Sequence, residues 1–252
     1  MKKFFWMLAI VLTCGVAFTS CGGDDEPTDL EISNDMMALN YGAQNVLSAN
    51  MTGCTWTSDN EYVATVDNEG RVTGVHVGEA TITCTKGDMT ATCVVNVNPI
   101  YTAWTLPVLN FGASQAKIKA DENHTLISEL CDDETLVFAA NDKLAYPWYI
   151  YDFSNDKMDD ATLGIANNTS AVEDMDKFLK QYYVALAPDE DGDVFYINAD
   201  MELDATIFAL TYPSDDNQTL MTSFETSETE AKSAKDVKAN LKSVAKRNSV
   251  KF

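Results

Sequence analysis

Three aromatic side chains on one short stretch, Trp148, Tyr149 and Tyr151, are the best candidates for ligand binding in the sequence. Aromatic rings pack against the C–H-rich faces of sugars, and carboxylates accept hydrogen bonds from sugar hydroxyls. Alternate residues of a strand point to opposite faces, so Trp148 shares one face with Asp152 and the two tyrosines share the other with Phe153. One face must pack in the core, and the alternative is that the whole cluster is structural.

An acidic loop, residues 189–193, places Asp189, Asp191 and Asp193 at alternate positions, as in a calcium-binding loop. A helix–loop–helix calcium site needs glycine at position six and glutamate at position twelve. This loop has Gly192 at position four and Asp200 at position twelve. We therefore predict a hairpin turn and assign no metal site, with weak calcium binding as the alternative.

A third candidate for chemistry is the thiol of Cys21. Lys2 and Lys3 precede an apolar run over residues 4–18, which is too short to span a bilayer as a helix. A basic start, a short apolar core and small residues before a cleavage point are typical of a secretory signal peptide. The alternatives are a secreted protein whose Cys21 forms a disulfide, and a short membrane anchor.

The end of this run, Phe18-Thr19-Ser20-Cys21, resembles the lipobox of bacterial lipoproteins, with Phe18 and Ser20 in place of the commoner residues, as in lipoproteins of the Bacteroidetes type. The resemblance implies a signal peptide over residues 1–20, lipid attachment at Cys21 and a membrane contact through that lipid. The acidic tether, 21–27, resembles an export signal of surface-exposed lipoproteins. It implies an outer-membrane, surface-exposed location, and a merely soluble tether is the alternative.

Other chemistries find little support in the sequence. There is no Cys-x-x-Cys pair, and His76 and His124 are the only histidines, which argues against a zinc or thioredoxin-type centre. A nucleophile elbow, a P-loop and a Rossmann glycine set are also missing. No two carboxylates stand out as a pair for glycoside hydrolysis. We therefore predict no catalytic residues, no cofactor and no enzymatic activity.

The charge of the chain excludes further partners. The 252 residues carry a formal charge of −22, which becomes −24 when Lys2 and Lys3 leave with the signal peptide. A chain this acidic is a poor partner for nucleic acid or anionic headgroups. Seven of the 17 basic residues lie in 232–251. We predict a basic C-terminal helix or tail over 226–252, which docks on the acidic body, binds a partner or stays a solvated, marginal helix.

Residues 28–98 form short alternating runs separated by turn residues, which indicates a β-sandwich. The stretch from Trp56 to Ile82 resembles the bacterial immunoglobulin-like domain, group 2. The shared pattern is a Trp-x-Ser pair, an Ala-x-Val-Asp run, a Val-x-Gly and a Gly-x-Ala-x-Ile. The resemblance implies a spacer or adhesion module without catalysis of its own.

Four cysteines remain beyond Cys21 in a context where disulfides persist. Cys84 and Cys93 are symmetric about the centre of the last predicted hairpin of the sandwich. If that hairpin closes symmetrically they face each other, so they are a candidate disulfide. Two buried thiols are the alternative. Cys54 shares the inward parity of Trp56 and is predicted to be a buried free thiol.

Residues 99–225 give a helix, four strands, a second helix and four more strands, which predicts an α+β domain. Shifting this segment on itself by 59 residues aligns apolar positions and turns without a gap. We therefore predict two repeats, 111–165 and 170–224. Coincidence is the alternative, because antiparallel strands recur at similar spacing in any case.

The predicted fold class is mainly β with α+β: an immunoglobulin-like β-sandwich followed by an α+β domain that contains a tandem helix-plus-four-strand repeat. The predicted function is that of a non-enzymatic, lipid-anchored cell-surface protein. Its sandwich acts as a spacer and presents the α+β domain for adhesion or for binding a glycan or a protein. The alternative is a structural or assembly component of an envelope complex without small-ligand binding.

Overall fold

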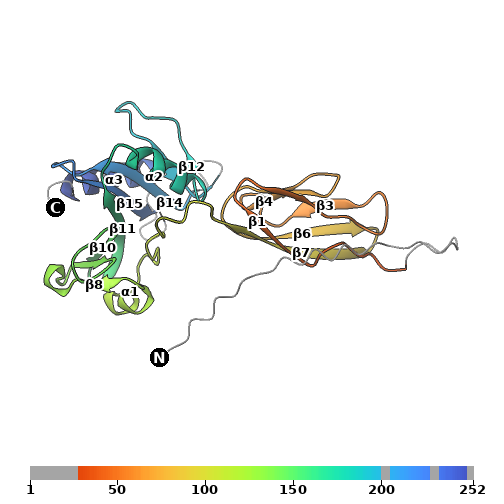
Figure 1. Ribbon diagram of the computed structural model, residues 1–252, viewed down its shortest axis with the longest axis horizontal. Helices are drawn as coiled ribbons and strands as arrows, with labels where there is room; N and C mark the ends of the chain where they lie inside the picture. The colour runs from red at the N-terminus through yellow and green to blue at the C-terminus, as the bar shows by residue number, and fades with distance from the viewer. Residues whose placement is uncertain (1–27, 200–204, 228–232, 249–252) are drawn as a thin grey trace.

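The structure is a computed structural model that describes residues 28–199, 205–227 and 233–248. The predicted signal peptide, Cys21 and the acidic tether lie outside the described residues. Two bodies lie end to end, a narrow sandwich and a broader body with helices (Figure 1). Within these three ranges, no helix combines the length and the apolar character that a membrane crossing requires.

The first body is the predicted β-sandwich. One sheet has the strand order β1-β7-β6-β3 and the other has the order β2-β5-β4. β1 runs parallel to β7, and the other strand pairs of both sheets are antiparallel. The strands are β1 Met36–Asn40, β2 Gln44–Val46, β3 Thr55–Ser58, β4 Ala64–Val66, β5 Arg71–Gly74, β6 Gly78–Lys86 and β7 Met89–Asn98.

Alternation explains how these strands build a core. Along β6, Ala80, Ile82 and Cys84 are buried while the residues between them are partly exposed. These three residues therefore share the inward face of the strand. Trp56 packs partly buried against the same core. A Cβ atom at Gly70 would lie 2.3 Å from the Leu47 carbonyl oxygen and 3.2 Å from the Trp56 ring.

The second body contains one antiparallel sheet of eight strands in the order β12-β13-β14-β15-β11-β10-β9-β8. The strands are β8 Thr125–Leu126, β9 Thr135–Ala139, β10 Trp148–Ser154, β11 Lys157–Ala166, β12 Val184–Ala185, β13 Phe195–Ile197, β14 Ile207–Pro213 and β15 Thr219–Thr226.

The helices are α1 Gln115–Asp121, the 3-10 turn η1 Ser128–Leu130, α2 Ala171–Lys180 and α3 Ala234–Asn248. Ser114 caps α1 by accepting a hydrogen bond from the Lys117 amide. In α2, Met175, Phe178 and Leu179 are buried, whereas Val172 is 64% exposed and lies outside the core.

The element order of this body is the predicted one, and two of its four pairs of corresponding strands recur at a constant spacing. β8 and β12 have bounds that differ by 59 residues, and so do those of β10 and β14. Each group of four strands forms a meander, and the two meanders join through the pairing of β11 with β15. This arrangement supports a duplicated unit, and the duplication itself stays a prediction.

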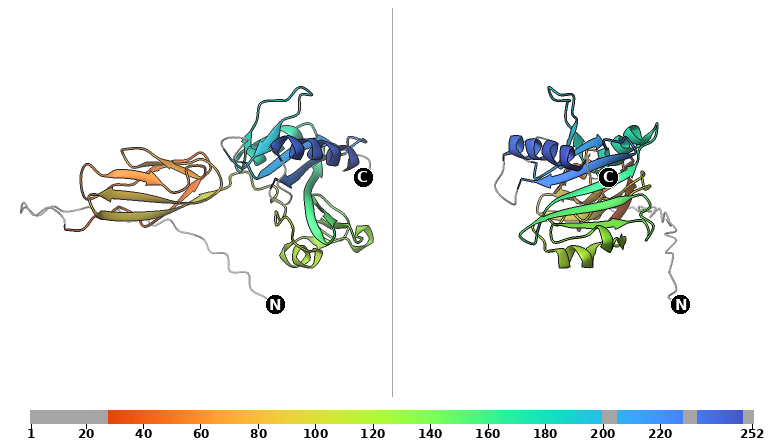
Figure 2. Two further views of the ribbon diagram at one scale, coloured as in Figure 1. Left: turned by 180° about the vertical axis from the view of Figure 1, so that it is seen from behind. Right: turned by 90° about the vertical axis from the view of Figure 1, so that its left-hand side faces the viewer.

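The eight-stranded sheet is covered on both faces. α1 and α2 contribute Ile118 and Phe178 to a large core on one face, together with Phe224 of β15. α3 lies against β14 and β15 on the other face, where Val237 and Leu241 are fully buried (Figure 2). Every residue of β15 is buried as a result.

Candidate functional site

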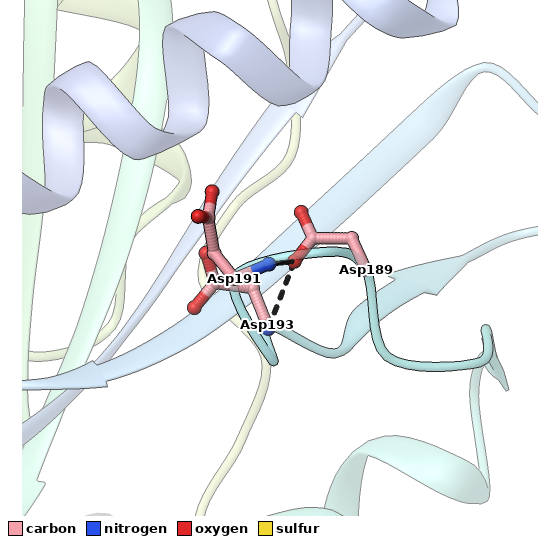
Figure 3. A group of neighbouring side chains, drawn as sticks. All are labelled: Asp189, Asp191 and Asp193. Carbon is pink, nitrogen blue, oxygen red and sulfur yellow. Dashed lines mark hydrogen bonds between the residues drawn. The ribbon is translucent and has the colours of Figure 1, made fainter.

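The acidic loop between β12 and β13 brings its three predicted carboxylates together. Oxygen atoms of Asp189, Asp191 and Asp193 lie within 4.8 Å of one another. Asp189 Oδ1 accepts hydrogen bonds of 3.0 Å from the Asp191 and Asp193 amides (Figure 3). The Asp193 carbonyl oxygen accepts a hydrogen bond of 3.0 Å from the Asp189 amide. The predicted hairpin turn is therefore confirmed, because these are the bonds of an Asp-initiated turn.

A side chain of the protein provides the cation that faces this loop. Lys242 Nζ of α3 lies 2.7 Å from an oxygen of Asp189, 2.6 Å from Asp191 and 3.2 Å from Asp193. The hydrogen bond with Lys242 lowers the pKa of Asp189, and its bonds with Asp189 and Asp191 raise the pKa of Lys242. The Lys242 ammonium group thus balances part of the negative charge of the three aspartates. These contacts dock α3 on the acidic turn.

The basic tail therefore docks on the acidic body, one of the three alternatives that the sequence left open. Val237, Leu241 and Val244 of α3 are buried. Asn240 also donates a hydrogen bond of 2.8 Å to Glu225 Oε1 on β15. Apolar burial supplies most of the docking free energy, because ion pairs at a surface contribute little.

The aromatic cluster divides between two environments. Tyr149 and Tyr151 are 0% exposed and belong to the core under α1 and α2, so neither ring can meet a ligand. Trp148 points to the other face, is half-buried and stacks on Tyr146 with ring centroids 4.5 Å apart. Its indole N–H donates to the Leu144 carbonyl oxygen at 2.8 Å. The prediction that the two tyrosines bind a ligand is therefore wrong, because they fill the core of a sheet covered on both sides.

The two buried tyrosines have polar partners that sequence reasoning missed. The Tyr151 hydroxyl donates to Glu122 Oε2, and the Tyr149 hydroxyl lies 2.9 Å from Thr105 Oγ1. His124 Nδ1 lies 2.6 Å from Glu122 Oε1, and the His124 ring stacks on Tyr149 at 4.1 Å. Only an unusual clustering of polar residues just after α1 could have indicated this network.

Burial and hydrogen bonding act in opposite directions on Glu122. Burial raises the pKa of its carboxyl, but hydrogen bonds from Tyr151 and His124 outweigh that effect and hold the pKa below its usual range. Burial, followed by the charge of Glu122, raises the pKa of Tyr151. The tyrosine therefore remains a donor and the glutamate an ionised acceptor at neutral pH.

The predicted disulfide between Cys84 and Cys93 is wrong. The hairpin of β6 and β7 places Cys84 opposite Ala91 and Cys93 opposite Ile82. Both thiols are free and buried. The reason is the two-residue turn Gly87–Asp88, which shifts the centre of the hairpin by one residue from the symmetric position.

A polar joint connects the two bodies. The side chain of Gln181, just after α2, is fully buried. Its Oε1 accepts from the Ile100 and Tyr101 amides at 3.0 and 3.1 Å, and its Nε2 donates to the Tyr101 carbonyl oxygen at 2.7 Å. The Gln181 carbonyl oxygen accepts from the Val77 amide of the sandwich at 2.7 Å.

A second contact of the joint comes from the sandwich. The Tyr62 hydroxyl donates to the Tyr182 carbonyl oxygen at 2.8 Å. The Tyr62 ring stacks on His76 with centroids 4.0 Å apart, and His76 Nδ1 lies 2.7 Å from the Tyr62 carbonyl oxygen. The Tyr62 side chain is therefore held by His76 on the sandwich side and bonds to Tyr182 on the other side of the joint.

Comparison with known proteins identifies the first body. Residues 30–96 match the family model of the bacterial Ig-like domain (group 2), which confirms the resemblance seen in the sequence. A search of the curated proteins gave no match.

The solved structures that are similar to the chain include the following three. A crystal structure of an intimin–Tir90 complex is 22% identical, with 42% of this chain and 66% of that chain covered and a TM-score of 0.25. Domains 5–6 of the S-layer protein SbsC are 17% identical, with 78% and 95% covered and a TM-score of 0.24. Domains 4–9 of SbsC are 18% identical, with 78% and 30% covered and a TM-score of 0.24.

Proposed function

We propose that this protein is a non-enzymatic, lipid-anchored cell-surface protein in which the sandwich is a spacer and the α+β body is the part presented to a partner. The observation that carries the proposal is the bonded joint at Gln181, which lies at one end of the sandwich. A lipid at Cys21 would hold the opposite end near the membrane.

The direction of the first strand supports this polarity. β7 ends at Asn98 beside the joint, and β1 runs parallel to it, with Asn40 paired to Asn98. The chain therefore comes into β1 from the side remote from the joint. A ten-residue strand such as β7 spans roughly 30 Å. The sandwich would separate an anchor at Cys21 from the α+β body by about this length.

The joint keeps this separation fixed. Flexible linkers between domains leave their backbone groups in water, whereas in this joint the amides of Ile100 and Tyr101 bond to one buried side chain. A bonded joint restricts the angle between the two bodies. It would therefore present the α+β body in a constant orientation, which reduces the entropic cost of binding a partner.

A protein or a glycan is the proposed partner of the presented body. Of the three predicted rings, Trp148 alone remains accessible, beside Tyr146. The burial of Tyr149 and Tyr151 removes the other two rings from any sugar-binding platform. This observation favours a second candidate function, a structural or assembly role in an envelope complex with a protein partner.

The anchor and the location are tested with Cys21→Ala. The unaltered chain should fractionate with membranes, carry fatty acyl groups by intact mass and be cut by protease added to whole cells. The Cys21→Ala variant should lose the acyl mass and leave the membrane fraction. Protection of the unaltered chain from external protease would contradict the surface location, and an unmodified mass would contradict the anchor.

The partner is tested with a glycan array and with pull-downs from envelope extracts. A glycan site at Trp148 predicts binding that Trp148→Ala abolishes and Trp148→Phe partly keeps, because phenylalanine retains a stacking face. Co-purifying envelope proteins without any glycan signal would support the assembly role. Glycan binding by both variants that equals that of the unaltered chain would exclude Trp148 as the contact.

The joint is tested by small-angle scattering. Gln181→Ala leaves the amides of Ile100 and Tyr101 without their buried acceptor, at a cost of about 1–3 kcal/mol for each unpaired group. We expect the distribution of distances between the two bodies to broaden. Gln44→Ala, at an exposed position of β2, is the matched control and should leave the scattering unchanged. An equally narrow distribution for Gln181→Ala would contradict the fixed spacer.

A further inference from the structure

We infer that the sandwich is a mechanical tether, and that its first and last strands form a clamp that resists stretching. The inference rests on the proposed function, because an anchor at Cys21 and a partner held by the α+β body would pull the sandwich from its two ends. Tension would enter through the segment before β1 and leave through Pro99, directly after β7. The two strands that receive this tension are neighbours in one sheet.

The direction of these two strands determines how the bonds between them are loaded. β1 runs parallel to β7 over its whole length, and Asn40 at its end pairs with Asn98. A pull on the N-terminal end of β1 and a pull on the C-terminal end of β7 therefore act in opposite directions along the strands. The evenly spaced bonds of a parallel ladder then share the force and must break together. Strands pulled apart from one end would instead lose their bonds one at a time.

Two hydrogen bonds mark the ends of the ladder between β1 and β7. The Val94 amide donates to the Asp35 carbonyl oxygen at 2.9 Å. The Tyr41 amide donates to the Asn98 carbonyl oxygen, also at 2.9 Å. The bonded region therefore extends one residue beyond β1 at each end, and the whole of β1 lies inside the clamp.

Burial protects one face of this ladder from water. Alternate residues bond in a parallel ladder, so the amides of Met37 and Leu39 face β7, as those of Asp35 and Tyr41 do. The side chains of Met37 and Leu39 are each 6% exposed and pack in the core of the sandwich. Water on that face is thus kept from replacing the inter-strand bonds as they stretch, which raises the barrier to forced unfolding.

A weaker contact lies ahead of the clamp. The Ser33 amide donates to the Ser48 carbonyl oxygen at 2.8 Å, and the Asn50 amide donates to the Glu31 carbonyl oxygen at 3.0 Å. This antiparallel contact is short, and Glu31 and Ser48 are exposed. It should open first under tension. Its opening releases only the residues before β1 and leaves the clamp intact.

Single-molecule force spectroscopy on the purified full chain tests the clamp by changing the direction of the pull. Azide-bearing residues at exposed positions attach the handles. Handles at Thr28 and Thr102 pull β1 and β7 lengthwise in opposite directions. Handles at Gln44 and Thr102 both lie at the Asn40 end of β1, so they pull the two strands apart from that end. Thr102 is common to both experiments, so the joint contributes equally to each.

The expected result is a difference in unfolding force between the two directions. The length released assigns each event to the sandwich, because an extended chain gains about 3.5 Å per residue. We expect a roughly threefold higher force for the lengthwise pull, because about three bonded positions of β1 share the force instead of one.

Two substitutions at Tyr41 isolate a single bond of the ladder. Tyr41 and Gly42 are the central residues of a turn, and the φ of Gly42 is +75°. The Ala43 amide closes this turn by donating to the Asn40 carbonyl oxygen at 2.9 Å. Proline is favoured at the first central position of such a turn, so Tyr41→Pro removes the amide that bonds to Asn98 and keeps the turn. Tyr41→Ala loses the same ring and keeps the amide.

In the lengthwise pull, we expect Tyr41→Pro to unfold at a force lower than that of Tyr41→Ala by roughly a tenth to a quarter, the share of one bond in this ladder. Equal forces in the two pulling directions of the unaltered chain would overturn the inference, and so would equal forces for the two Tyr41 variants. The handles replace both the anchor and the partner. Loss of the proposed anchor would therefore leave these forces unchanged, and the two failures are distinguishable.

Discussion

The two bodies of this protein bury their strands in different ways. In the sandwich, each sheet has one face in the core and one towards solvent, and buried and exposed residues alternate, as along β1. In the α+β body, helices and the segment 104–113 cover both faces of the sheet, and all eight residues of β15 are buried.

This difference shows when strand alternation predicts exposure. Alternation separates two faces, but it places one of them in water only if nothing covers that face. On β10, Tyr149 and Ile150 point to opposite faces, and both are buried. The covered second face also holds polar side chains, including Asp160, Thr162 and Ser223. One-sided burial is therefore a property of the sandwich and not of the chain as a whole.

Gly70→Ala should destabilise the sandwich more than any other variant considered and leave the α+β body folded. A Cβ at this position would lie 2.3 Å from the Leu47 carbonyl oxygen, and φ is +75°. We expect a loss of about 4 kcal/mol from strain and overpacking together. Hydrogen exchange measured region by region should rise in the sandwich.

Gly42→Ala is the matched control for this variant. Its φ is also +75°, but a Cβ there would meet nothing within 4 Å. Only the backbone strain remains, at about 1 kcal/mol. Equal losses of stability in Gly70→Ala and Gly42→Ala would show that crowding against the Leu47 carbonyl oxygen does not affect the stability of the sandwich.

The second effect, Leu241→Ala, should break the α+β body and spare the sandwich. Leu241 is fully buried between α3 and the sheet. Removing its methyl groups should cost about 3 kcal/mol, measured by denaturant unfolding. Ser243→Ala, on the exposed side of α3, should have little effect. If Leu241→Ala and Ser243→Ala lose the same stability, the packing of α3 on the second face of the sheet does not stabilise the α+β body.

The third effect tests the buried carboxylate network by pH. The folded-state pKa of Glu122 is lowered, so its contribution is complete above the unfolded pKa of about 4.3 and is lost as the pH falls through the folded pKa. Glu122→Gln should cost about 2 kcal/mol at pH 7. It should also flatten the acid limb of stability against pH, whereas Glu129→Gln, at an exposed position, should not.

The smallest effect concerns Lys242→Met, which keeps the aliphatic stem and removes the ammonium group beside the acidic loop. Because the charges are partly exposed, the loss should be smaller than that of Leu241→Ala. It should disappear at 1 M salt, where screening is strong. A loss that persists at high salt would point to packing of the stem rather than to the ion pairs. Denaturant unfolding at low and high salt measures the difference.

Much of the fold was predictable from local patterns. The order of elements in the α+β body follows from periodicity along the chain, and the turn at Asp189 follows from nearby residues. The Cys84–Cys93 pairing failed because a one-residue difference in turn length changes every cross-strand partner. Sequence symmetry does not determine that length.

The sandwich, the order of elements and the acidic turn could be predicted from local patterns, because they depend on periodicity and turn chemistry within a few residues. The fold was needed to see that α3 covers the second face of the sheet, that Glu122 meets Tyr151, and that Gln181 closes the joint. These contacts join residues far apart in the chain. The physical reason is that burial of a face depends on what packs against it, and no local pattern encodes the identity of that neighbour.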